Sequence, residues 1–221
     1  MNPTDLEKLK EICTAAGFKK KGNAFFRIVG DGVFQIIKCQ NARRLHADVI
    51  YVGLYSMYGK MNLRCFSGTD RTSMYSVVNC YEKNTYPLIY VPEIHVQLQM
   101  LQEEVIPWLN GMVTQKQLSR AINSVDSLWH SSEKIWVYLA CGEYNHAKKV
   151  IKEIIGDYCY TMIRKAPKRE ETVEDLLARV NREEKPYYGI IEIIDRGEEA
   201  IQAYLQANLE MNMQNAKFCT K

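Results

Sequence analysis

The chain has 221 residues, with 29 basic and 26 acidic side chains and a formal net charge of +3. Hydrophobic residues make up 47% of the sequence and charged residues 25%, a composition that is typical of an ordinary globular protein and excludes a disordered chain, a collagen and a coiled-coil rod. The length predicts one domain or two. The small basic excess does not by itself indicate a nucleic-acid or membrane partner.

The cysteines and the hydropathy pattern bear on the compartment. The seven cysteines are widely spaced and include no CxxC pair, which favours free thiols in a reducing cytoplasm over a disulfide framework or a zinc site. No apolar stretch approaches the roughly 18 residues that cross a bilayer, and the charged N-terminal segment does not resemble a secretory signal. We expect a cytoplasmic protein with no membrane partner, no metal site and no cofactor.

The first predicted element is a helix over residues 5–16. Thr4 and Glu7 have the spacing of a capping box, which predicts the start of the helix. Gly17 is suited to a left-handed residue at its end, with Phe18 folding back onto the last turn. The predicted buried face follows a three- and four-residue spacing and consists of Leu6, Leu9, Ile12, Cys13 and Ala16.

The following segments have the pattern of β-strands. Residues 25–29 and 33–40 are rich in aromatic and β-branched side chains, and Gly30-Asp31-Gly32 between them predicts a hairpin turn. An antiparallel sheet that is buried on one face is the simplest arrangement. Further strands are predicted at residues 46–57, 61–66, 73–81 and 87–91.

From residue 92 onward the apolar spacing is helical. A helix is predicted over residues 94–109, with a kink in its last turn at Pro107 and an end at Gly111. Thr114 and Gln117 form a second capping box, which predicts the start of another helix.

Two later segments have the pattern of helical hairpins. Residues 135–147 resemble the elbow of a tetratricopeptide helix pair, and residues 194–205 repeat it with two residues fewer between the glycine and the alanine. Two copies fall short of the roughly three that a solenoid needs, so two ordinary helical hairpins are the alternative. Between the copies, residues 161–185 hold 13 charged residues of mixed sign, which indicates a solvated segment with a short helix near Thr172.

These patterns predict an α+β protein, in which an N-terminal helix and an antiparallel β-sheet precede a helical C-terminal half with a tetratricopeptide-like helical hairpin. The two predicted regions are residues 1–110 and 111–221, and the second either shares one core with the first or folds beside it. The net charge lies in the first region, which has 13 basic and 10 acidic residues against 16 and 16 in the second.

Short motifs occur in a definite order in the first region: Gly17-Phe18-Lys19-Lys20-Lys21-Gly22, Phe26-Arg27, Asp31-Gly32-Val33-Phe34-Gln35 and Gln40. In this order and spacing, residues 5–110 resemble the bacterial family catalogued as domain of unknown function 4304. Asn41-Ala42 depart from the family pattern, which has a serine close to the position of Gln40. The family has no assigned activity, so the resemblance implies a small cytosolic bacterial accessory protein and no particular reaction.

A basic and aromatic patch is the first candidate binding site. Lys19, Lys20 and Lys21 stand near three phenylalanines and Arg27, a pattern that suits phosphate contacts and base stacking. In the alternative, the lysines complement the dipole at a helix C-terminus and the phenylalanines belong to the core. Three lysines neutralise few phosphates, which favours the alternative.

Polar residues on the predicted hairpin form the second candidate. Arg27, Gln35, Lys38 and Gln40 would make a polar recognition surface if they shared one face of the sheet, although alternation also produces an ordinary solvent-facing side. Seven tyrosines lie between residues 51 and 90, and tyrosine is favoured both at half-buried interfaces and in strands.

Catalytic motifs are absent from the sequence. Cys39 and His46 are close together, but no motif orients them as a nucleophile and a base, and there is no phosphate-binding glycine loop or nucleophile elbow. The sequence predicts a non-catalytic protein-binding module, one form of which is a toxin-neutralising immunity protein. The alternatives are weak nucleic-acid binding through Lys19–Lys21, and an enzyme whose site forms only in three dimensions.

Overall fold

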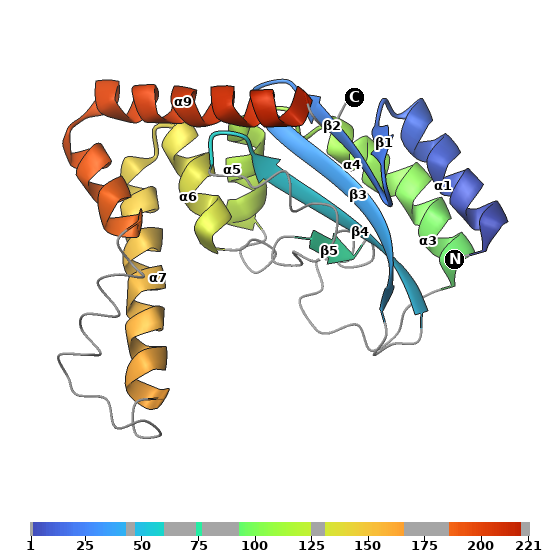
Figure 1. Cartoon of the computed structure of the whole chain (residues 1–221), viewed down its shortest axis with the longest axis horizontal. Coiled ribbons are helices and arrows are strands. Elements are labelled where there is room, and N and C mark those ends of the chain that lie inside the picture. Colours follow the sequence, from blue (N-terminus) through green and yellow to red (C-terminus); the bar gives the residue numbers. More distant parts are fainter. Residues whose placement is uncertain are drawn as a thin grey trace.

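An antiparallel sheet packed against helices makes up the protein, as the α+β prediction requires (Figure 1). The computed structural model describes residues 2–42, 47–59, 74–76, 93–124, 131–165 and 186–217. The strands predicted at residues 61–66 and 87–91, and the short helix predicted near Thr172, lie outside the described residues.

Helix α1 (Pro3–Ala15) begins earlier than predicted. Its cap is Asn2, whose side-chain oxygen accepts a hydrogen bond from the backbone N–H of Asp5 at 2.8 Å. The prediction of Thr4 as the cap is wrong, because Pro3 has the fixed φ that suits the first helical residue and lacks an N–H where none would be paired. Thr4 therefore lies within the first turn.

The end of α1 is as predicted. Gly17 has a φ of +81°, and the N–H of Phe18 donates to the backbone oxygen of Cys13 at 2.9 Å, which is the pattern of a glycine-terminated helix. The predicted buried face is narrower in the structure, since Leu6 is 39% exposed. Its buried members are Leu9, Ile12 and Cys13.

The sheet consists of β1 (Lys19–Lys21), β2 (Ala24–Val29), β3 (Val33–Ala42), β4 (Ala47–Ser56) and β5 (Met74–Ser76). Within the described residues these strands lie in the order β1-β2-β3-β4-β5, and every neighbouring pair is antiparallel. The predicted β2–β3 hairpin is confirmed, with φ values of +47° and +61° at Gly30 and Gly32 in its turn. Strand β1 is absent from the predicted set, because three consecutive lysines have no apolar alternation.

Both faces of the sheet carry buried residues, whereas the sequence predicts burial of one. On the first face, Ile37 and Val52 lie opposite each other and belong to the main hydrophobic cluster. On the second face, Phe34 and Tyr55 are paired and belong to a smaller cluster that includes Ala216. The prediction of a half-buried sheet is wrong, because the C-terminal helix supplies an apolar cover for the second face.

The helix predicted over residues 94–109 has three parts: α3 (Ile94–Met100), the π-helical turn η2 (Leu101–Val105) and α4 (Ile106–Asn110). The kink predicted at Pro107 stays a prediction, and the π-helical turn lies directly in front of the segment that contains this proline. Proline has no N–H to donate to the preceding turn, and a wider turn accommodates the interruption. Gly111 ends α4, as predicted.

The remaining labelled helices are α5 (Gln115–Ser124), α6 (Ser131–Ala140), α7 (Tyr144–Lys165) and α9 (Glu198–Lys217), and a further helical segment covers residues 186–195. The capping box at the start of α5 is confirmed: the N–H of Gln117 donates to Thr114 Oγ1 at 3.2 Å, and the N–H of Thr114 donates to Gln117 Oε1 at 2.9 Å. Gly142 and Gly197, with positive φ, separate the helices of two hairpins. Their relation to tetratricopeptide repeats stays a prediction.

Helix α9 passes from the helical layer to the second face of the sheet (Figure 1). Its first half contributes Ile201 and Leu205 to the main cluster, and its second half contributes Ala216 to the smaller one. The main cluster contains buried residues from Leu9 to Leu205. Side chains from both predicted regions are therefore packed in one cluster.

Two asparagines attach α9 to the end of β4. Asn212 Nδ2 donates to the backbone oxygens of Met57 and Gly59, both at 2.7 Å. Asn208 Nδ2 donates to the backbone oxygen of Tyr58 at 2.9 Å. Both asparagines are buried, so three consecutive carbonyl groups after β4 are paired by side chains of one helix.

Candidate binding surface

Strand β1 places the three predicted lysines at the outer end of the sheet. Lys19, Lys20 and Lys21 all have exposed side chains, and β1 occupies the end position of the strand order. Because side chains alternate along a strand, Lys20 lies on the first face and the other two lysines on the second. Their partners in the register are Phe26, Phe25 and Ala24, in that order.

The aromatic part of the predicted patch is inside the protein. Phe18, Phe25 and Phe26 are 3%, 1% and 6% exposed, and they belong to the two hydrophobic clusters. Base stacking requires an accessible ring face. The exposed part of this patch therefore consists of lysines.

Arg27 is held by four groups from different parts of the chain. Its Nε donates to Gln35 Oε1 at 2.8 Å, its Nη1 to the backbone oxygen of Ala16 at 2.5 Å and its Nη2 to Asn110 Oδ1 at 2.7 Å. Its Cζ lies 4.4 Å from the centre of the Phe18 ring. Ala16 and Asn110 lie at the C-terminal ends of α1 and α4, so the guanidinium stands where the negative ends of two helix dipoles meet.

Gln35 continues the same network into the core. It is fully buried, lies opposite Arg27 in the register, and its Nε2 donates to the backbone oxygens of Leu109 at 2.8 Å and Met112 at 2.9 Å. The structure thus brings together Arg27 and Gln35, two of the four residues of the hypothetical polar surface. Their polar atoms face the ends of helices, where they fix the sheet against α1 and α4.

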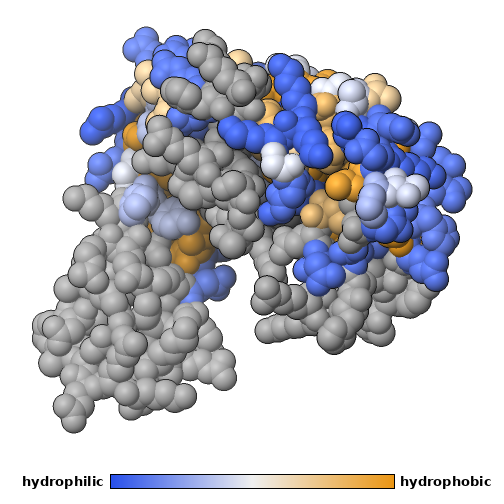
Figure 2. Space-filling model, turned by 45° about the vertical axis from the view of Figure 1, so that its right-hand side comes forward, coloured by the Kyte–Doolittle hydropathy of each residue, from blue (hydrophilic) through white to orange (hydrophobic). Residues whose placement is uncertain are grey.

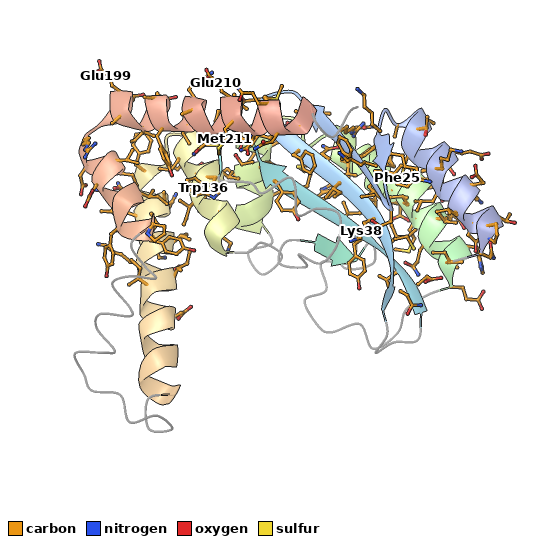
Figure 3. All side chains as sticks on the ribbon, in the orientation of Figure 1. Phe25, Lys38, Trp136, Glu199, Glu210 and Met211 are labelled. Carbon is orange, nitrogen blue, oxygen red and sulfur yellow. The ribbon has the colours of Figure 1, made fainter. Side chains whose placement is uncertain are left out.

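Lys38 does not join this pair. Lys38 lies on the second face of the sheet, in register with Ala24 and Tyr51, and it is 5% exposed (Figure 3). Gln40 follows two positions later in β3, in register with Val49. The shared face on which the predicted polar surface depended is therefore not formed, because alternation along β3 separates Gln35 from Lys38.

A groove of about 440 Å³ lies between α1 and the η2–α4 segment. Hydrophilic residues cover most of the described surface in Figure 2, with apolar residues between them, and the groove has the same mixed character. Helical spacing in the sequence does not predict this groove, because it identifies the apolar face of each helix and not which faces become neighbours. Its lining consists of Lys8, Glu11, Ile12, Ala15, Ala16, Gln102, Ile106 and Asn110.

The thiols have the properties of packed side chains. Burial raises the pKa of Cys13 to about 12. The pKa of Cys141 is raised to about 11, first by burial and then by the charges of Glu143 and Asp31. A raised pKa keeps a thiol protonated at neutral pH, which is the opposite of what a nucleophile needs. Cys39 is half-buried in β3, and His46 lies outside the described residues.

One cluster of polar groups at the α6–α7 elbow has the residue types of a hydrolase site. Ser119 Oγ donates to Glu143 Oε1 at 2.7 Å, and His146 Nδ1 lies 3.0 Å from Glu143 Oε2. The carboxylate therefore stands between the serine and the histidine. In a catalytic triad the histidine must contact the serine, so this cluster has the wrong order for that chemistry.

No family model matches the chain, and neither a curated protein nor a solved structure matches it. Among the residues that the structure describes, no group of three or more His, Cys, Asp or Glu side chains is placed to hold a metal ion. No helix in the described parts of the chain is long and apolar enough to cross a membrane.

Proposed function

We propose that the protein is a non-catalytic protein-binding module that uses the edge of the sheet at β1. The observation that carries this proposal is the contrast between Lys19–Lys21, which are exposed on an end strand, and Arg27 and Gln35, whose hydrogen bonds are made within the fold. The raised pKa values of Cys13 and Cys141 add support, because they disfavour a thiol nucleophile at neutral pH.

A protein partner fits this surface better than a nucleic acid. Three lysines contact about three phosphates, which provides only weak and strongly salt-dependent binding. The nearby phenylalanines, Phe18, Phe25 and Phe26, are buried and offer bases no platform for stacking.

We also propose that the protein works in a reducing cytoplasm and that residues 5–110 are related to the family of unknown function 4304. The most specific role that we propose for the binding module is that of an immunity protein. Cys13 and Cys141, which are outside any disulfide, support the compartment. The relation is supported by the convergence of motif residues on one network, in which Arg27 bonds to Gln35 and stacks on Phe18.

Affinity capture with matched variants tests the proposed function. The wild-type chain, a Lys19→Glu/Lys20→Glu/Lys21→Glu variant and a control are immobilised and exposed to a lysate of the source organism. The control changes Lys116, Lys152 and Arg196 to Glu, which alters the net charge equally at exposed positions distant in sequence from β1. We expect the wild type and the control to retain the same protein, which then binds as a purified component. Recovery of only a small metabolite, or retention that nuclease treatment abolishes, contradicts a protein-binding role.

A further inference from the structure

Within the described residues, no strand pairs with β1 on the side away from β2. Because β1 is the end strand in the strand order of the sheet, its backbone N–H and C=O groups that point away from β2 take no part in the hydrogen bonds between these strands. Helix α1 lies beside β1 (Figure 1), yet Lys19, Lys20 and Lys21 all remain exposed. The three lysine side chains, on which recognition by charge depends, are therefore accessible beside the helix.

The three lysines determine which strand fits this edge. A strand from a second copy of the chain would place like charges side by side, which destabilises the pairing. An acidic strand would instead place carboxylates next to the lysines. These carboxylates would be needed on both faces of the sheet, because Lys20 lies on the face of Phe25, whereas Lys19 and Lys21 lie on the face of Phe26. Within the described residues no carboxylate forms an ion pair with Lys19 or Lys20, so their charges are not neutralised there.

We infer that β1 accepts an extended acidic segment of a partner protein as an added edge strand. Backbone hydrogen bonds along this edge supply the attachment, and carboxylates next to the three lysines supply the selectivity. This inference rests on the proposed protein-binding function and specifies the partner's chemistry. Lysines on an end strand also discourage aggregation, and the same charges that repel basic strands attract an acidic one.

Peptides of matched charge test the inference with the full chain. The probe is a short peptide with three consecutive glutamates between flanking valines, whose carboxylates lie on both faces when the peptide is extended. It is compared with the same peptide carrying lysines in place of the glutamates, and with an acidic peptide of the same charge that contains central prolines. We expect the acidic strand-forming peptide to bind at least about tenfold more tightly than either of the others, because the lysine peptide is repelled and the proline peptide lacks backbone donors. It should also slow amide hydrogen exchange at residues 19–21.

Reversing the charges on β1 should reverse the preference. The Lys19→Glu/Lys20→Glu/Lys21→Glu variant should lose about tenfold or more in affinity for the acidic peptide and gain affinity for the lysine peptide, while the control at Lys116, Lys152 and Arg196 should behave as wild type. Circular dichroism verifies that both variants are folded.

Three outcomes overturn the inference. The first is that the acidic peptide does not bind. The second is that the proline peptide binds as tightly as the acidic peptide and neither slows amide exchange at residues 19–21. The third is that a single-stranded oligonucleotide binds more tightly than every peptide. The capture experiment separates these failures from failure of the proposed function. If the wild type and the β1 variant retain the same protein, protein binding stands and the edge of β1 is not its site.

Discussion

Arg27 illustrates how a residue suited to binding can serve the fold instead. Its planar guanidinium reaches Gln35, Ala16 and Asn110 at the same time and lies over the ring of Phe18. The geometry of the fork matters as much as the charge, because a lysine ammonium cannot direct donors in these fixed directions. The partners come from α1, β3 and α4, so the side chain joins elements that are far apart in the sequence.

Substitution of Arg27 by Lys should therefore lower the free energy of unfolding by about 1–3 kcal/mol, the range for hydrogen bonds to a charged group and the partners left unpaired. Urea denaturation measures the loss. The control is Arg120→Lys at an exposed position of α5, where the effect should lie within about 0.5 kcal/mol. Equal stability of the two variants would contradict the structural role of Arg27.

Tyr58 links stability to alkaline pH. Burial, together with the hydrogen bond from its hydroxyl to Asp31 Oδ1 at 2.8 Å and the charge of that carboxylate, raises the pKa of Tyr58 from 10.0 to about 12. The folded state holds the phenol neutral, so this contribution to stability is complete below pH 10 and is lost as the pH rises toward 12. Between these values the unfolded tyrosine ionises first, and the free energy of unfolding falls.

The Tyr58→Phe variant should show a shallower decline of unfolding free energy across that alkaline interval than the wild type. The matched control is Tyr188→Phe, because Tyr188 is 40% exposed. Chemical denaturation at a series of pH values provides the comparison. A decline of the same slope in the wild type and in Tyr58→Phe would show that Tyr58 is not the linked group.

The two capping boxes show what can be predicted for single elements. Thr114 and Gln117 are reciprocally bonded at the start of α5, whereas Thr4 and Glu7 have the same spacing and no capping role, since Asn2 caps α1. We expect Thr114→Ala and Asn2→Ala each to cost about 1 kcal/mol of stability and Thr4→Ala to cost only a few tenths. Thermal or urea denaturation of the three variants gives the ranking, and a loss in Thr4→Ala as large as that in Asn2→Ala would reverse the assignment of the cap.

Local patterns predicted most of the described elements because turn chemistry and apolar spacing determine them. The hairpin around Gly30 and Gly32 and the end of α1 at Gly17 both follow from residues that favour positive φ. The contacts of Arg27 and Gln35 could not be predicted in this way. Each depends on which helix ends arrive at β2 and β3, and periodicity within one element carries no information about that.

At the scale of the whole molecule, α9 joins the helical layer to the sheet. Asn212 pairs with the carbonyl groups of Met57 and Gly59 in a fully buried position, so Asn212→Ala leaves two buried acceptors unpaired. The expected cost is about 2–4 kcal/mol, in a single unfolding transition. Gln214→Ala, at an exposed position of the same helix, should be nearly neutral. A variant that loses only the end of α9 while the rest unfolds as in the wild type would show that α9 is a separate unit.

The same packing predicts that residues 1–110 do not fold alone. The main cluster needs Ile135 and Leu139 from α6 and Leu205 from α9, and the smaller cluster needs Ala216. Without them, apolar groups on both faces of the sheet would be exposed, at a cost of roughly 25 cal/mol per Å² of apolar surface. A fragment of residues 1–110 should therefore show no cooperative urea transition, while the full chain shows one. A fragment that unfolds cooperatively would establish the first region as an independent domain, and α9 would then be an attachment to a sheet that is stable without it.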